Sequence, residues 1–278
     1  MYFLLYSLFY MLSLLPFTVL YLLSDGLYFI LYRCVGYRKE VVLENLRIAF
    51  PEKNLEEHLA ITKKYYHNLC DSIVETVKMF SISEHELNKR VACDHWSVLE
   101  EMTTFAKNGQ GFVAHQFNWE WATLICNKKS PRQFTGVYLP LTNSIFDRLM
   151  YTIRSRNRMT LVKVQEMQQQ MAHLQQQEIL WGFIADQNPS DPKRVSWNDF
   201  FHRKTAFFKA PEFIARRYNN LVYFVEKKKK KRGYYRLNIK LAFEHPNQTS
   251  EGDITEAYVR FLEDSIKRQP ENWVWSHR

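Results

Sequence analysis

The chain has 278 residues, of which 46% are hydrophobic and 24% charged, and its net charge is +9. This hydrophobic content suffices for a real core, and the sparse glycine and proline leave no linker, so we expect one globular domain. The four cysteines are scattered without a C-x-x-C pair, which favours reduced thiols and argues against a structural metal.

The positive charge suits a protein that lies against anionic lipid headgroups or binds an acidic partner. Nucleic acid is the competing explanation for a basic chain. No zinc-ligand, helix-turn-helix or RNA-binding aromatic motif supports it, so we expect no nucleic-acid partner.

The N-terminal stretch from Tyr2 to Leu23 contains no charged residue and is long enough to cross a bilayer as one helix. Cations follow only on its C-terminal side, beginning at Arg33, which predicts a cytoplasmic position for the rest of the chain. Without a basic n-region or a small-residue cleavage site, a cleaved signal peptide is disfavoured. We predict a membrane anchor over residues 1–36 and a globular domain over residues 37–278. A buried core helix and a helix lying in the interface are the alternatives.

Helical periodicity predicts a helix that stops at Pro51 and a second from about Leu55 to Met79. Strand-like runs at 111–114, 134–138, 161–164 and 179–185 then alternate with helical stretches at 119–126, 143–154 and 165–177. The segments 221–231 and 234–243 form a hairpin around Gly233, and a last helix spans about 254–267. This order predicts an α/β fold with a mixed, mostly parallel sheet flanked by helices.

The first of these strands ends in His115, and Glu120 follows five positions later. In one continuous helix the two side chains would point about 140° apart, so they converge only if His115 ends a strand and Glu120 begins the next helix. Asn118 is a plausible cap for that helix. A carboxylate bonded to one ring nitrogen would leave the other free as a general base. A hydrogen-bonded strand end without catalysis is the alternative.

Asp186 also follows a predicted strand. Active sites of such sheets gather at the carboxyl ends of the strands. His115 and Asp186 could therefore face one crevice.

Several separated segments resemble the late acyltransferases of lipid A biosynthesis. AHQFNWEWA (114–122) resembles the H-x-x-x-x-[DE] motif of lipid acyltransferases, and ENLRIAFPE (44–52) looks like that family's Asn-Leu…Phe-Pro-Glu element. YLPLTNSIFDRLMYTIR (138–154), ADQNP (185–189) and QPENWVWSHR (269–278) resemble three further elements in the expected order. The resemblance covers nearly the whole chain after the N-terminal helix, and it implies that the chain ends a few residues before the family's usual C-terminus.

The resemblance implies a membrane-bound O-acyltransferase at the inner membrane, with its catalytic domain on the cytoplasmic face. It would move a fatty acyl chain from an acyl thioester, acyl-acyl-carrier-protein, to a hydroxyl of a lipid A precursor without a cofactor. His115 would be the general base, and Glu120 would orient and stabilise its imidazolium. The resemblance further implies substrate-binding or supporting roles for Asn118, Asn143, Arg154, Asp186, Gln187, His277 and Arg278. Helix caps, internal ion pairs and a packed C-terminal tail are the alternatives for these residues.

The sequence departs from the family in two places. Gln-Phe-Asn-Trp separates His115 from Glu120 where a glycine is often found, and Asn-Pro-Ser follows Gln187 in place of another acidic residue. The acceptor is therefore open, and acyl transfer to another lysolipid or aminolipid is one alternative. A non-enzymatic, membrane-tethered binding module is another.

The remaining motifs narrow the chemistry. No serine or cysteine sits in a recognisable nucleophile elbow, which favours direct transfer over an acyl-enzyme. A metalloprotease is unsupported because the chain has no H-E-x-x-H.

The run Lys227 to Arg232 places six cations at the predicted hairpin tip. Such runs are usually solvated, and contact with lipid phosphates or the acidic carrier protein is the alternative.

Overall fold

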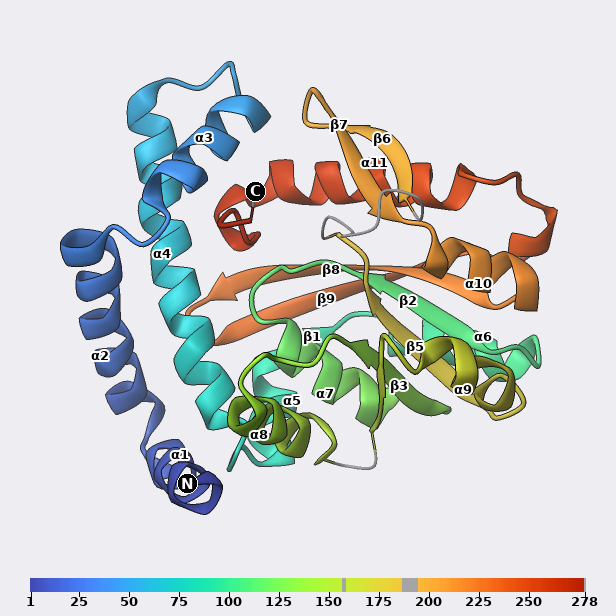
Figure 1. Ribbon diagram of the computed structural model, residues 1–278, viewed down its shortest axis with the longest axis horizontal. Helices are drawn as coiled ribbons and strands as arrows, with labels where there is room; N and C mark the ends of the chain where they lie inside the picture. Colours follow the sequence, from blue (N-terminus) through green and yellow to red (C-terminus); the bar gives the residue numbers. More distant parts are fainter. Residues whose placement is uncertain (157–158, 187–194, 278) are drawn as a thin grey trace.

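The computed structural model describes residues 1–156, 159–186 and 195–277. One seven-stranded sheet has the order β1-β9-β8-β2-β5-β3-β4, and helices cover both of its faces (Figure 1). Its strands are β1 (Val91–Cys93), β2 (Gly109–Val113), β3 (Gln133–Tyr138), β4 (Thr160–Lys163), β5 (Ile179–Ile184), β8 (Leu221–Lys231) and β9 (Tyr234–Phe243). All neighbours pair in parallel except β8 with β9, which confirms the α/β fold with a mostly parallel sheet.

The predicted helices are present with shifted ends. They are α3 (Lys39–Ala49), α4 (Leu55–Lys78), α7 (Trp119–Lys129), α8 (Ser144–Arg154), α9 (Met167–Leu174) and α11 (Asp253–Arg268). Short elements escaped prediction, among them α5 (Glu84–Arg90), α6 (Glu101–Thr104), β1, α10 (Ala210–Tyr218) and the separate hairpin of β6 (Val195–Phe200) and β7 (Arg203–Phe208). Most of these elements carry charged residues, and β1 spans three residues only, so they show little apolar periodicity.

The two faces of the sheet have different cores because side chains alternate along a strand. On one face Phe112 and Phe224 pack with Tyr258 of α11, and α3, α4 and the β6–β7 hairpin complete that layer. On the other face Tyr223 and Val225 lie in a second cluster with residues of α5, α7 and α8. Figure 1 shows these two helical layers on opposite sides of the strands.

The uncharged N-terminal stretch is two helices, so the prediction of one helix over Tyr2–Leu23 is wrong. α1 (Tyr2–Leu14) ends before Pro16, and α2 (Phe17–Tyr28) continues as a π-helical segment to Val35. Proline cannot donate a backbone hydrogen bond, and the residue before it avoids helical dihedrals; Leu15 accordingly has ψ 145°. Among the described residues, the helix long and apolar enough to cross a membrane is Phe17–Val35.

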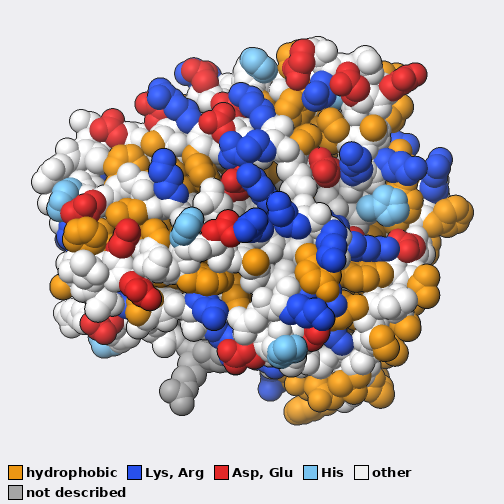
Figure 2. Space-filling view, turned by 180° about the vertical axis from the view of Figure 1, so that it is seen from behind, with side chains coloured by type: hydrophobic (Ala, Val, Ile, Leu, Met, Phe, Trp, Pro, Cys, Tyr) orange, Lys and Arg blue, Asp and Glu red, His pale blue; other side chains and the backbone are white. Residues whose placement is uncertain are grey.

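The N-terminal helices pack against α4, which lies between α2 and the sheet (Figure 1). Tyr21 donates a hydrogen bond to Glu75 at 2.9 Å, and Ser24 donates one to Asp71 at 2.8 Å. Large apolar side chains of the N-terminal segment nevertheless stay exposed. In Figure 2, which is seen from behind, this segment lies at the right, where orange patches are visible. The exposed apolar side chains include Phe3, Leu4, Leu8, Met11, Leu14, Leu22, Leu23, Phe29 and Ile30.

Candidate active site

Two neighbouring strands end together at the carboxyl edge of the sheet. β2 and β5 pair in parallel, with Val113 opposite Ile184, and His115 and Asp186 each follow two residues later. His115 Nδ1 lies 2.6 Å from Asp186 Oδ1, and the backbone N–H of His115 donates to Asp186 Oδ2 at 2.8 Å. The two residues therefore meet at this edge, as their positions after two predicted strands indicated.

The Asp186 carboxylate is almost fully enclosed, with 1% of its side chain exposed. Trp273 Nε1 donates a third hydrogen bond to it, at 2.7 Å from Oδ2. Burial acts to raise the pKa of the Asp186 carboxyl, but the charge and hydrogen bonds of His115 and the Trp273 indole outweigh it and lower that pKa. An ionised Asp186 holds the imidazole by Nδ1, and such an arrangement makes Nε2 the ring nitrogen that can accept a proton.

Glu120 does not take the place beside His115 that the sequence suggested. Asn118 caps α7 as predicted, and Glu120 lies in its first turn. Its carboxylate accepts hydrogen bonds from the Arg154 guanidinium on α8, at 3.0 Å from Nε and also from Nη2. The prediction that Glu120 orients the His115 ring is therefore wrong: a neighbouring parallel strand brings Asp186 into register with His115, while Glu120 faces α8.

The Glu120–Arg154 ion pair ties α7 to α8 just behind the strand ends. The exposed side-chain fractions are 7% for Glu120 and 24% for Arg154. Burial acts to lower the pKa of the Arg154 guanidinium, but the nearby Glu120 carboxylate raises it overall. Arg154 is thus held in an internal ion pair, one of the two interpretations that its position allowed.

The two asparagines with predicted substrate roles both cap helices. Asn118 Oδ1 accepts from the backbone N–H of Trp121 at 3.2 Å, and Asn118 Nδ2 donates to Glu75 at 3.0 Å. Asn143 Oδ1 accepts from the backbone N–H of Ile145 at 3.0 Å at the start of α8. Gln187 and Arg278 lie outside the described residues.

The C-terminal segment forms one wall of the site. The backbone N–H of Phe117 donates to Asn272 at 3.0 Å, and that of Val274 donates to the His115 carbonyl at 3.2 Å. The His277 ring consequently lies 6.2 Å from the His115 ring, centroid to centroid. Burial and the neighbouring His115 lower the pKa of His277. The structure therefore brings together His115, Asp186 and His277 of the predicted site residues.

The segment 44–52 supports this wall from outside. Asn45 Nδ2 donates to the backbone carbonyls of Trp275 and His277, at 2.8 and 2.7 Å. Phe50 contacts the Trp275 ring with centroids 5.9 Å apart. Two of the segments that carry the family resemblance, from opposite ends of the chain, are thus in contact beside His115.

The cationic run 227–232 is a solvated tip only in part, because four of its six residues are buried or ion-paired within the protein. Lys229 binds Asp71 at 2.8 Å, and Arg232 binds both Asp71 and Asp25. Lys227 is buried. Lys228 is partly exposed and lies 3.5 Å from Glu226, while Lys230 and Lys231 are exposed at the end of the strand and form no ion pair with a residue that the structure describes.

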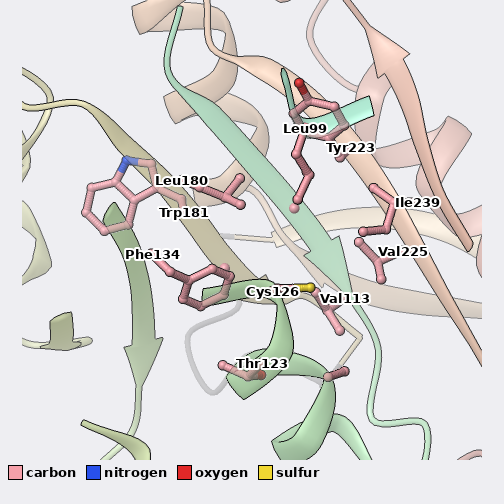
Figure 3. Close-up of a pocket in the computed structure, with 13 residues that line it drawn as sticks. Leu99, Val113, Thr123, Cys126, Phe134, Leu180, Trp181, Tyr223, Val225 and Ile239 are labelled. Carbon is pink, nitrogen blue, oxygen red and sulfur yellow. The ribbon is translucent and has the colours of Figure 1, made fainter. Parts of the chain in front are cut away.

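An apolar cavity lies between α7 and the sheet, near the ends of β2 and β5 (Figure 3). The volume of this cavity is about 30 Å³, which is room for a water-sized molecule. Gly111 of β2 and Gly182 of β5 are in register on its floor, and the Phe134 ring lies directly over Gly182, where a Cβ would come within 2.5 Å of it. Figure 3 shows the side chains around it: Leu99, Val113, Thr123, Cys126, Phe134, Leu180, Trp181, Tyr223, Val225 and Ile239.

Fold and site together define an α/β protein with a histidine–aspartate pair at the carboxyl edge of its sheet, beside an apolar cavity. The family model for bacterial lipid A biosynthesis acyltransferases matches residues 1–278, so the chain belongs to that family and is an acyltransferase. It is similar to the lipid A biosynthesis lauroyltransferase of Escherichia coli (strain K12), with 23% identity over 273 residues that cover 95% of this chain and 86% of the relative. The expected family is confirmed.

Sequence reasoning missed two residues of this region. Trp273 lies within the C-terminal segment 269–278 and received no role of its own, although its indole donates a hydrogen bond to Asp186. Lys227 was grouped with the exposed cations, although the alternation of β8 places it on the same face as the buried Tyr223 and Val225.

Proposed function

We propose that the protein transfers a fatty acyl chain from acyl-acyl-carrier-protein to a hydroxyl of a lipid A precursor at the membrane surface, with His115 as general base. Family membership supplies acyl transfer in lipid A biosynthesis. The observation that carries the assignment of the base is the buried Asp186 carboxylate on His115 Nδ1. A base oriented by a carboxylate can accept the hydroxyl proton at Nε2.

In this mechanism the hydroxyl oxygen attacks the thioester carbonyl carbon while its proton moves to His115 Nε2. Asp186 stabilises the imidazolium, as a buried carboxylate does in other histidine-based sites. The tetrahedral intermediate then collapses, the carbon–sulfur bond breaks, and the thiolate leaves with the proton that His115 held. Glu120 contributes by fixing Arg154 and the start of α7, so its role is positioning.

The apolar lining of the cavity is the feature that suits an acyl substrate, and its present volume of about 30 Å³ would have to widen to admit a chain. Val113, two residues before His115, lies on its wall, so a chain in the cavity would have its carbonyl end near the base. Removing a hydrocarbon chain from water contributes roughly 25 cal/mol per Å² of buried apolar surface. The lining residues offer the chain an almost entirely apolar contact surface.

The N-terminal helices would hold the protein on the inner membrane with the site on the cytoplasmic face. Phe17–Val35 is the candidate span, and the exposed apolar side chains of α1 lie beside it. Arg38 and Lys39 follow the span directly, which favours a cytoplasmic position for what comes after.

Leu4, Leu8 and Met11 are exposed on α1 at spacings of four and three, so they share one helical face. Changing all three to serine is expected to weaken liposome binding at least about tenfold, since each loses roughly 1.5–3 kcal/mol of apolar burial in lipid. Flotation with liposomes in high salt measures this loss. Serines at Leu5 and Phe9, which pack inward, should instead lower thermal stability. Unchanged flotation of the outer-face variant would show that α1 does not hold the protein on lipid.

The donor and acceptor are tested with purified protein and a lipid A precursor in mixed micelles, followed by mass spectrometry of the lipid. We expect a mass gain of one acyl group, faster with acyl-acyl-carrier-protein than with acyl-coenzyme A. The advantage of the acidic carrier should shrink as salt rises, because exposed charges on the basic protein are screened. Acylation of a different lysolipid alone would move the assignment to that acceptor. Binding without any acylation would favour a binding module.

A further inference from the structure

Lys227 is the buried cation that this mechanism has not used. It follows Tyr223 and Val225, two residues of the cavity wall, at steps of two along β8, so its side chain lies on the cavity face of the sheet. Only 2% of Lys227 is exposed, and its Nζ has no hydrogen-bond partner among the residues that the structure describes. An unpartnered ammonium inside a protein is costly, which points to a purpose other than stability.

The backbone of Lys227 is fixed to the loop that carries His115. Its N–H donates to Gln116 Oε1 at 2.9 Å, and its carbonyl accepts from Asn272 Nδ2 at 2.8 Å. The parallel register of β2 and β8, with Phe112 opposite Phe224, would place His115 opposite Lys227 when continued by three residues. Lys227 is therefore held next to the site by bonds that do not involve its side chain.

The charges around the Lys227 amine already have other partners. Burial lowers the pKa of Lys227 to about 7, while Asp186, the Cys126 thiol and Glu120 act in the opposite direction. Asp186 is bonded to His115, and Glu120 to Arg154. The amine thus lies within electrostatic reach of both carboxylates, and its N–H groups remain available to a third group.

We propose that the Lys227 amine donates a hydrogen bond to the carbonyl oxygen of the acyl thioester and stabilises the oxyanion of the tetrahedral intermediate. This inference rests on the proposed acyl transfer. As the acceptor oxygen bonds to the carbonyl carbon, the π electrons move to the carbonyl oxygen beside Lys227 Nζ, and they return when the carbon–sulfur bond breaks. Arg154 is a poor candidate for this task because Glu120 occupies its guanidinium.

The test is Lys227→Met, which keeps the length of the side chain and removes its donor. We expect kcat to fall about 10²- to 10³-fold, as for the loss of one oxyanion donor, with KM for the carrier-bound donor changed less than threefold. The melting temperature should stay level or rise by about 2–4 °C, because a buried unpartnered amine is replaced by an apolar group. A purely structural lysine predicts the reverse: lower stability and activity that follows the folded fraction.

Lys240→Met on the neighbouring strand β9 is the matched control, since it makes the same exchange at an exposed position. It should keep wild-type kcat. If the wild type is active and the Lys227→Met protein is equally active, the oxyanion role alone is overturned. Wild type that transfers no acyl group overturns the proposed function and this inference together.

Lys227→Gln keeps the test open should the methionine variant fail to fold. The amide retains N–H donors without the charge, so we expect kcat about tenfold below wild type, with KM unchanged. Full activity in Lys227→Gln at wild-type stability would mean that the charge of Lys227 contributes nothing to the transition state. A glutamine variant as impaired in folding as the methionine variant would show that Lys227 is a structural residue.

Discussion

Replacing His115 by alanine or Asp186 by asparagine is expected to lower kcat by about 10³- to 10⁴-fold with the fold intact. His115→Ala removes the base. Asp186 accepts three hydrogen bonds, from the His115 ring, the His115 backbone and the Trp273 indole. Asparagine can satisfy the two N–H donors at the Oδ2 position with its one oxygen, and its NH₂ group then donates to His115 Nδ1. The ring then favours the tautomer with hydrogen on Nε2, which cannot accept a proton.

Steady-state rates of both variants and of the double variant measure this effect. The double variant should be scarcely slower than His115→Ala, because the two residues act as one unit. Asp199→Asn, an exposed carboxylate of β6, and His173→Ala, an exposed histidine of α9, are the matched controls and should keep full activity. Wild-type turnover by Asp186→Asn would mean that the carboxylate only holds the fold and that the base is oriented otherwise.

Among the variants proposed for this protein, we expect the loss of one partner of the Glu120–Arg154 ion pair to lower the free energy of unfolding most. Arg154→Met leaves a carboxylate that is 7% exposed without its cation, which costs about 3–5 kcal/mol in the free energy of unfolding. Adding Glu120→Gln to Arg154→Met removes the stranded charge and should restore most of that loss. Urea denaturation of the two variants and of the wild type gives the three free energies.

Arg260→Met is the control for this pair. Arg260 forms an exposed ion pair with Glu256 on α11, and its loss should change the unfolding free energy by less than about 1 kcal/mol. If Arg154→Met were as mild, the Glu120 carboxylate would have water or another cation within reach. If the double variant regained stability but stayed inactive, Glu120 would be required for more than its ion pair.

Local pattern was enough to predict much of the fold and part of the site. The buried strand before His115, the cap at Asn118 and the apolar strand before Asp186 depend on residues near in sequence, and each is present. The meeting of His115 with Asp186 also followed, because parallel strands end at a common edge.

The partner of a side chain depends on contacts across the chain, and there the prediction failed. Glu120 was assigned to His115 by closeness in sequence, but Arg154, 34 residues away, takes it. Trp273 reaches Asp186 across 87 residues. The periodicity of the sequence does not specify which nearby charge Glu120 will pair with. That choice depends on how α7 and α8 pack against each other.

Glu75 gives the N-terminal helices a consequence for handling the protein. Its fully buried carboxylate accepts hydrogen bonds from Tyr21, Tyr235 and Asn118, so one side chain joins α2, the β8–β9 hairpin and the cap of α7. Trimming the chain to residue 37, the usual route to a detergent-free preparation, would strip away Tyr21 and open this group to solvent. Replacing the exposed apolar residues of α1 with polar ones is the better way to gain solubility, because it leaves the hydrogen bonds of Glu75 intact.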